Sequence, residues 1–300
     1  MKNTQPASES APVTPGRVTF IDGQNEMPAV EITTAWSRAE IYLQGAHVTQ
    51  FVKTNEHPLL FLSQCSRFSD GQPIRGGVPV IFPWFGMREG LGQHGFARNR
   101  AWELKEVLTE LDGSVSLRFR LPKYPDAATL PPFRADYIVT VKDTLTLCLE
   151  VLNESEDEPL TFESCLHTYF EVGDVTAISI KGLKGMDYLD KVANFSRKTE
   201  NEESIRISCE VDRTYLDTTG PVEIIDTRLG RRVVIEKQGS ASTVVWNPWV
   251  AKAQQMLDFG DDEYQRMVCV ESGNVASNQT SLPPGKATSL TVRLASYPLA

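Results

Sequence analysis

Residues 135–152, ADYIVTVKDTLTLCLEVL, are the stretch that decides the fold class. Apolar side chains occupy every second position on both sides of Lys142-Asp143, and one face of the second half carries Leu145, Leu147, Leu149 and Val151. Alternation with a period of two places successive side chains on opposite faces of a β-strand. The stretch therefore predicts a hairpin in a sheet that has one buried and one solvated face.

The same period recurs outward from this hairpin. Residues 115–121 alternate apolar residues with Ser and Arg after a turn at Asp112-Gly113, and residues 39–52 hold two further segments with Gly45 at the break. Further short strands are predicted at residues 160–172, 175–180, 204–209, 233–237, 242–246, 267–271 and 289–294. The best short-helix candidate is Ala251–Phe259, and residues 122–132 are expected to form a Pro-rich loop. So many strands with so little helix predict an all-β fold, a large antiparallel sandwich or barrel.

Charge and composition narrow the classes of partner. The chain has 300 residues and a formal net charge of −9, which argues against binding to nucleic acid or to an anionic membrane surface. Its five cysteines show no C-x-x-C spacing, so we expect reduced thiols, no structural metal and a cytoplasmic location. Residues 1–16 are polar and predict a disordered tail, and residues 17–300 are expected to form a single domain and a monomer.

A second stretch concentrates polar chemistry. Residues 73–98 read PIRGGVPVIFPWFGMREGLGQHGFAR, which has more glycine, proline, arginine and histidine than an ordinary core element. We interpret it as the floor of a small-molecule site. Arg75 and Arg98 bracket it and could grip a phosphate, or each could form a structural ion pair. His94 lies beside a glycine, and its sequence context leaves a functional and a structural role equally open.

Histidines and one carboxylate are the remaining candidates for chemistry. His47 and His57 lie in a strand and a turn, where packed or surface roles are expected, and His167 alone would also suggest a core residue. Glu271 ends the apolar strand MVCV, where an unpaired charge would be expensive. It is either an ion-pair partner of an arginine or a general base. No dinucleotide, Walker or H-E-x-x-H motif is present, so no cofactor and no metal are expected.

Five segments together resemble one known family. They are PIRGGVPVIFPWFG, QHGFARNRAWEL, LHTYFEV, VDRTYLDT and VVWNPWVAKAQQMLDFGDDEYQRMVCVESGN. In this order they are similar to the glucose-6-phosphate 1-epimerases of the aldose 1-epimerase superfamily, over roughly residues 17–297. The resemblance implies a large antiparallel β-sandwich of galactose mutarotase type. It also implies that His167 is the general acid and Glu271 the general base.

By the same resemblance, Arg75, Gln93, Arg98 and Asp212 line the substrate pocket, and His94 lies near the sugar hydroxyls. An acid and a base suffice to open an aldose ring and close it on the other face, without metal or nucleotide. The two arginines favour a hexose 6-phosphate, glucose 6-phosphate first, as the substrate. Whether Arg88 joins them stays open. The alternatives are an aldose 1-epimerase acting on free hexoses and a non-catalytic carbohydrate-binding sandwich.

Overall fold

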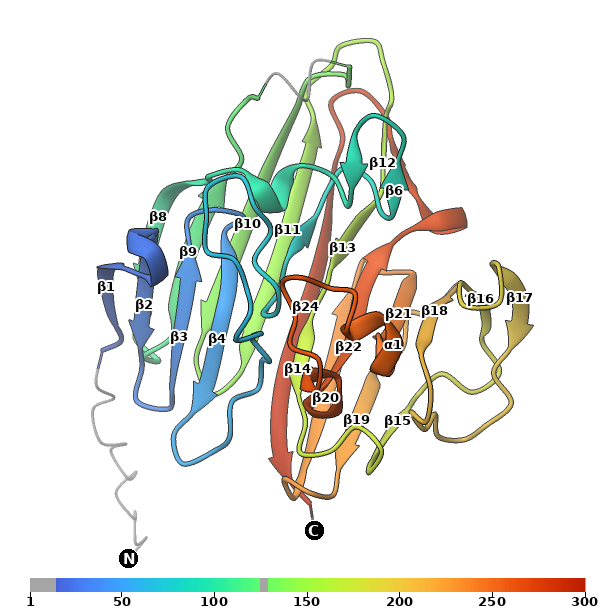
Figure 1. The fold of residues 1–300 in the computed structure, drawn as a ribbon. Helices are drawn as coiled ribbons and strands as arrows, with labels where there is room; N and C mark the ends of the chain where they lie inside the picture. Colours follow the sequence, from blue (N-terminus) through green and yellow to red (C-terminus); the bar gives the residue numbers. More distant parts are fainter. Residues whose placement is uncertain (1–14, 125–128, 300) are drawn as a thin grey trace, which may run out of the picture.

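The structure is a computed structural model that describes residues 15–124 and 129–299. Almost the whole predicted tail, residues 1–16, therefore lies outside the described residues, as does part of the predicted loop at 122–132. The chain is folded almost entirely into antiparallel strands (Figure 1). Among the described residues, no helix is both long and apolar enough to cross a membrane.

An eight-stranded antiparallel sheet forms one layer of a sandwich. It contains the predicted hairpin, in which Val141 of one strand faces Leu145 of the other. Its strands, in spatial order, are β15 (Ile178–Lys181), β19 (Val222–Asp226), β20 (Arg231–Gln238), β24 (Ala287–Pro298), β11 (Leu145–Asn153), β10 (Phe133–Val141), β9 (Val115–Arg120) and β8 (Glu103–Thr109). The residues predicted on the buried face of β11 are all at most 2% exposed, so the prediction from alternation is confirmed.

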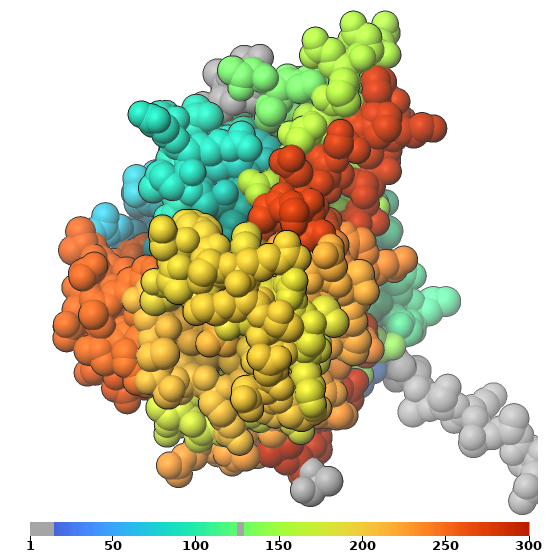
Figure 2. All heavy atoms as spheres, turned by 90° about the vertical axis from the view of Figure 1, so that its right-hand side faces the viewer, coloured from blue at the N-terminus to red at the C-terminus, as the bar shows by residue number. Residues whose placement is uncertain are grey.

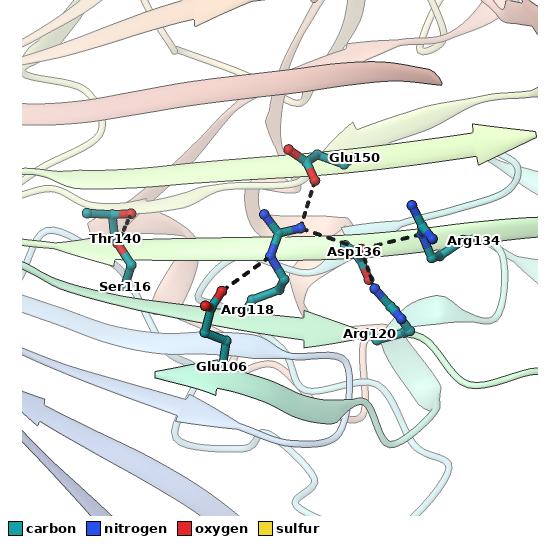
Figure 3. Close-up of polar contacts among 8 residues, drawn as sticks. All are labelled: Glu106, Ser116, Arg118, Arg120, Arg134, Asp136, Thr140 and Glu150. Atoms are coloured by element: carbon teal, nitrogen blue, oxygen red, sulfur yellow. Dashed lines mark hydrogen bonds and ion pairs between the residues drawn. The ribbon is translucent and has the colours of Figure 1, made fainter. Parts of the chain in front are cut away.

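The opposite face of this sheet is polar. Asp136 accepts hydrogen bonds from Arg120, Arg118 reaches both Asp136 and Glu150, and Ser116 pairs with Thr140 (Figure 3). These are the Ser and Arg residues that alternate with the buried apolar ones in the sequence. The period of two thus separates a hydrophobic core from a charged, solvent-facing ladder.

The second layer consists of two sheets, which lie in front of the first in Figure 1. The N-terminal sheet holds β1 (Arg17–Asp22), β2 (Pro28–Thr33), β3 (Ser37–Tyr42) and β4 (His47–Lys53) in sequence order. The other, called here the β22 sheet, has the order β17 (Ser196–Thr199), β16 (Asp187–Asp190), β18 (Val211–Tyr215), β21 (Ser242–Asn247), β22 (Met267–Asn274), β13 (Ser164–Leu166) and β5 (Val80–Ile81), and β14 (Tyr169–Glu171) also pairs with β22. One hydrophobic cluster joins the layers, with Ile41, Leu147 and Val270 among its members.

Short elements complete the fold. Strands β12 (Leu160–Phe162) and β23 (Thr280–Leu282) pair with each other, as do β6 (Met87–Arg88) and β7 (Gly92–Gln93). The one α-helix in the described ranges is α1 (Trp249–Ala253), and single 3₁₀ turns span Gln24–Glu26, Ala97–Asn99, Glu263–Arg266 and Ala276–Asn278. The tight break predicted at Gly45 has φ +73°, and a Cβ there would lie 2.7 Å from the Arg98 carbonyl oxygen.

Three predicted elements differ from the structure. Residues 160–172 form three short strands, and the last two are separated where the backbone turns at His167: Thr168 N donates to Leu166 O. Residues 204–209 are a loop with one β-bridge, from Ile205 to Ile180. The alternation in this segment arises because its isoleucines are buried, although the segment forms no strand. The predicted helix over residues 251–259 is shorter and earlier, at Trp249–Ala253, and turns follow it.

Candidate active site

A cavity of about 590 Å³ lies over one face of the β22 sheet. Strand register explains which side chains reach it. Val244 of β21 lies opposite Glu271 of β22, Thr214 of β18 opposite Val244, and Leu189 of β16 opposite Thr214. Directly opposed residues in antiparallel strands share a face of the sheet, and all four line the cavity. The floor of the site is therefore a single sheet face, assembled from strands far apart in the sequence.

His167 and Glu271 meet at the centre of this face. Leu166 lies opposite Ser272 and Tyr169 opposite Cys269, so the same register brings His167 opposite Glu271. His167 Nε2 is 3.3 Å from Glu271 Oε1, and the Cys165 thiol donates to Glu271 Oε2 at 3.4 Å. The carboxylate, 1% exposed, is thus paired with a histidine and a thiol in place of the arginine that the structural alternative required. The site brings the predicted acid and base into direct contact.

Burial sets the protonation of this pair. Burial raises the pKa of Glu271 to about 8, against an opposing effect of the Lys191 charge. Burial also lowers the pKa of His167 well below its usual value, with help from neighbouring His94 and the Arg98 charge. Desolvation disfavours the charged form of each group. Near neutral pH the pair accordingly holds one proton, which rests on Glu271 and can pass to His167 across the 3.3 Å contact.

Arg75 lines the cavity next to the pair. Its guanidinium donates through Nε and Nη2 to Asp258 and through Nη1 to the Tyr169 hydroxyl, at 3.0 to 3.2 Å. The Tyr169 ring in turn stacks on the His167 ring, with centroids 4.8 Å apart. A guanidinium has five N–H donors, so Arg75 keeps donors for a ligand. His47, predicted to be a packed residue, contacts the residue that follows Arg75: its Nε2 is 2.7 Å from Gly76 O.

The β6–β7 hairpin and the residues after it close one side of the cavity. Gln93 is exposed and lines the opening, and His94 is 7% exposed, with its ring edge-on to His167. Gly86 N donates to His94 Nδ1 at 3.2 Å, which leaves Nε2 as the proton-bearing nitrogen of a neutral ring. Burial lowers the pKa of His94, and the Arg98 charge adds to this effect. The adjacent Gly95 permits close approach to the Phe82 carbonyl, 2.0 Å from a hypothetical Cβ, and that approach accounts for the glycine.

Arg98 lies behind the cavity wall. It is 8% exposed, its Nη2 donates to Gln93 O at 2.9 Å, and its Nε has no hydrogen-bond partner. In the described ranges it is not among the residues that border the cavity. Burial lowers its pKa to about 10, and the Arg75 charge contributes. The structure thus places Arg75 at the cavity surface and Arg98 beneath it.

Asp212 also borders the cavity, where it forms an ion pair with a lysine side chain. Lys191 Nζ is 3.0 Å from Asp212 Oδ1 and lies over the Phe85 ring, 4.6 Å from its centroid. Lys252 follows from α1, paired with Glu210 at 3.0 Å. The face in Figure 2 shows the segment around β16 and β17 in yellow, below the teal segment that contains β6 and β7. Three cationic side chains therefore reach one cavity in a chain whose net charge is negative.

Comparison with known proteins identifies the family. The family model described as aldose 1-epimerase matches residues 28–295. This chain belongs to that family. A protein of Cenchrus ciliaris named "Putative glucose-6-phosphate 1-epimerase" is 37% identical over 270 residues, which cover 87% of this chain and 82% of the relative. A protein of the same name from Escherichia coli K12 is 34% identical over 257 residues, 85% of this chain and 86% of the relative.

Solved structures extend the comparison to the fold of this aldose 1-epimerase family member. A crystal structure from Salmonella typhimurium, described as "a putative mutarotase (YeaD)", has a TM-score of 0.86 at 28% identity and covers 97% of this chain and 96% of its own. A galactose mutarotase related enzyme from Lactobacillus acidophilus reaches a TM-score of 0.70 at 16% identity, over 90% of this chain and 97% of its own. The predicted all-β sandwich of galactose mutarotase type is confirmed.

Several cavity residues of this epimerase-family chain were not predicted from the sequence. Lys191 lies in an ordinary polar hairpin, and its position becomes evident when β16 pairs with β18. Glu163 lines the cavity, but both of its carboxylate oxygens already accept backbone hydrogen bonds, from Phe85 N and Ala276 N. Arg88, which was left open, is exposed, stacks on Trp84 at 5.4 Å and is absent from the cavity lining in the described chain.

One group of side chains in this site could hold a metal ion. The ligand atoms of His167, Cys269 and Glu271 all lie within 4.8 Å of one another. Sequence spacing did not suggest this group, because no two of its members are separated by a known metal-binding interval. Its three residues come from β22 and from the turn between β13 and β14.

Proposed function

We propose that this protein interconverts the α and β anomers of an aldohexose 6-phosphate, most directly glucose 6-phosphate, and that His167 and Glu271 carry the proton transfers. The observation that carries this proposal is the 3.3 Å contact between these two groups at the floor of a cavity lined by cations. The aldose 1-epimerase family match supplies the reaction class. A non-catalytic sugar-binding sandwich would not require two buried groups with opposed pKa shifts at its floor.

The chemistry needs one proton delivered and one removed. In ring opening, the base takes the proton of the C1 hydroxyl, the bond from C1 to the ring oxygen breaks, and the acid protonates the ring oxygen. Rotation about the bond from C1 to C2 and closure on the other face return both protons. We assign the first acid to His167 and the base to Glu271, acting after the shared proton has passed from the carboxyl group to the imidazole across their 3.3 Å contact, and closure reverses these roles. The pair starts and ends with the same single proton, so no net proton is consumed.

Arg75 supports the assignment of a phosphorylated substrate. It borders the cavity with donors to spare, and a guanidinium binds phosphate oxygens with well-matched geometry. Lys191 and Lys252 add positive charge to the same cavity lining. The relatives named for glucose 6-phosphate agree with this choice. Gln93, His94 and Asp212 are assigned to sugar hydroxyls, and Arg98 contributes its charge from behind the wall.

Exchange NMR of anomers tests the substrate assignment. We expect faster enzyme-dependent α to β exchange for glucose 6-phosphate than for glucose, and equal kcat/KM values would instead favour the free-hexose epimerase. Arg75→Gln should raise KM for the phosphate ester about 10- to 100-fold, as expected for the loss of charge-assisted hydrogen bonds. Arg88→Gln is the matched control, because Arg88 is exposed and outside the cavity.

Removing the base tests catalysis itself. Glu271→Gln keeps the shape of the side chain, so the sugar phosphate should still bind while the rate falls by about 10²- to 10⁴-fold. Binding is measured by calorimetry and the rate by the same exchange experiment. Full activity of this variant would make Glu271 a structural carboxyl group and would favour a different base.

A further inference from the structure

We infer that His167, Cys269 and Glu271 form a binding site for a soft divalent cation such as Zn²⁺ or Cd²⁺, and that the bound cation excludes the sugar. The three ligand atoms lie within 4.8 Å of one another and the residues are at most 7% exposed. Imidazole nitrogen, thiolate sulfur and carboxylate oxygen are the donor types that zinc uses in proteins. Three protein ligands with an open fourth position resemble a reactive zinc site in their arrangement.

Strand alternation places these ligands together. Cys269 and Glu271 are two residues apart on β22, so both side chains leave the same face of the strand. The intervening Val270 belongs to the main hydrophobic core, whereas Cys269 packs with Tyr169 and Trp246 on the cavity side. His167 completes the group from the neighbouring strand register, 3.3 Å from Glu271 Oε1. That spacing matches two ligands of one tetrahedral ion bound at ~2.0–2.1 Å.

The donor atoms are available for coordination. His167 Nε2 faces Glu271 Oε1 and the Cys269 sulfur lies within 4.8 Å of both ligand atoms, while the unpartnered Nδ1 is left to carry the ring proton when Nε2 coordinates. Cys165 donates to the far oxygen, Oε2, of Glu271 and leaves Oε1 facing the histidine. Hydrogen bonds of this kind orient a carboxylate ligand from behind. The site thus has three ligands and an outer partner that holds one of them.

Charge balance favours a divalent ion here. A thiolate and a carboxylate carry two negative charges, which a divalent cation neutralises, so the buried complex has no net charge to desolvate. On binding, the Cys269 S–H bond breaks, sulfur donates its electron pair to the metal, and the thiol proton leaves to solvent. A proton on Glu271 leaves in the same way. No oxidant or reductant takes part, and binding should strengthen as pH rises because protons are released.

The consequence for turnover rests on the proposed function. His167 and Glu271 would be metal ligands and proton-transfer groups at once, so a sugar and a cation compete for them. Zinc inhibition should therefore be competitive with the sugar. Cys65 and Cys209 are exposed, and their substitution serves as the control for substitution of Cys269.

Cobalt titration of the full chain tests binding without any reference to activity. Co²⁺ should bind once per chain and give thiolate-to-cobalt charge-transfer absorption with intense bands of a four-coordinate ion. Cys269→Ala should abolish this spectrum, whereas Cys209→Ala and Cys65→Ala should retain it. Glu271→Gln removes a second ligand while keeping the thiol, and it should weaken binding by at least about 10- to 100-fold, the loss expected even for an outer-shell partner. Circular dichroism checks that each variant is folded.

Three results would overturn the site: wild-type protein without a thiolate-to-cobalt band, a band that survives in folded Cys269→Ala, or cobalt binding by folded Glu271→Gln that is as tight as in the wild type. Inhibition is then measured with Zn²⁺ and the sugar exchange assay. The concentration for half-inhibition should rise with sugar concentration and should be at least about 10-fold higher in Cys269→Ala than in Cys209→Ala. A positive cobalt spectrum in a protein without epimerase activity would sustain the metal site and refute the proposed function, so the two failures are distinguishable.

Discussion

The ring of His167 lies nearly parallel to the ring of Tyr169, with an angle of 11° between their planes. The hydroxyl of that tyrosine accepts a hydrogen bond from Arg75 Nη1 at 3.0 Å. One aromatic ring therefore lies between the arginine proposed to hold phosphate and the imidazole proposed to move a proton. Tyr169 therefore links the arginine proposed to bind phosphate to the histidine proposed to transfer protons.

Tyr169→Phe should separate these two contributions. The ring that stacks on His167 remains, while Arg75 loses one of its partners, so KM for glucose 6-phosphate should rise about fivefold, as expected for ~1 kcal/mol, with a smaller change in kcat. Exchange NMR at several concentrations measures both. Tyr124→Phe is the control, because its hydroxyl donates to Ala101 O outside the cavity. An equal rise in KM for free glucose would disconnect Tyr169 from phosphate binding.

The pH dependence of kcat/KM should follow the single shared proton. Glu271 has a raised pKa of about 8, so the free enzyme loses that proton, and with it activity, as pH rises through 8. His167 has a pKa held well below 6.5, so the pair gains a second proton at acid pH only. Activity should therefore persist from pH 6.5 to pH 8.

Exchange rates between pH 5 and 10 check this profile. They are to be measured with both phosphorylated and free hexose, because phosphate itself titrates near pH ~6. A midpoint near the usual pKa of a glutamate, with activity rising above it, would show that the free enzyme works with an ionised Glu271.

Glu271→Gln should change how stability depends on pH. The wild-type folded state holds the Glu271 proton up to about pH 8, whereas the unfolded chain releases it near the usual glutamate pKa of 4.5. Between these values the folded state binds more protons, so its stability falls as pH rises. The variant lacks this loss and should gain a few kcal/mol relative to wild type by pH 9, as an order of magnitude. Urea unfolding at pH 5 and pH 9 measures the difference. A constant gap between the proteins would contradict it.

Inorganic phosphate should stabilise the wild-type protein. Arg75 and the buried Arg98 repel one another, and an anion in the cavity relieves that repulsion. At ten times its Kd, phosphate should add ~1.4 kcal/mol and raise the unfolding midpoint by a few degrees relative to chloride at equal ionic strength. Arg98→Met should lose most of this rise and Arg88→Met should keep it. A full rise in Arg98→Met would exclude a role for its charge.

The sequence predicted those parts of the fold that depend on local alternation. The β10–β11 hairpin and its buried face follow directly from residues 135–152. Residues 160–172 look like one strand because they are rich in apolar and aromatic residues, yet a backbone hydrogen bond between Thr168 and Leu166 interrupts them. No side-chain pattern encodes that turn. It occurs at His167, so the local error coincides with the proposed acid.

The site was predicted only in part, for a similar reason. Motifs identified Arg75, His167 and Glu271 individually, but their distances depend on strand register, which no single segment specifies. Arg98 resembles Arg75 in sequence context, and depth below the cavity surface distinguishes them. Lys191 carries no motif at all and reaches the cavity because β16 pairs with β18.

The alternation of β22 has a consequence for how this chain can change in evolution. Odd-numbered residues from Met267 to Gly273 face one side of the sheet and even-numbered residues face the other. The carboxyl group of Glu271 therefore reaches the cavity only if it stays at an odd-numbered position of the strand. Inserting one residue before Glu271 would turn the carboxyl group into the hydrophobic core and a valine into the cavity. A two-residue insertion would preserve the faces. Tolerated length changes should therefore accumulate in the hairpin loops around the cavity, where substrate range can diverge while β22 stays fixed in length.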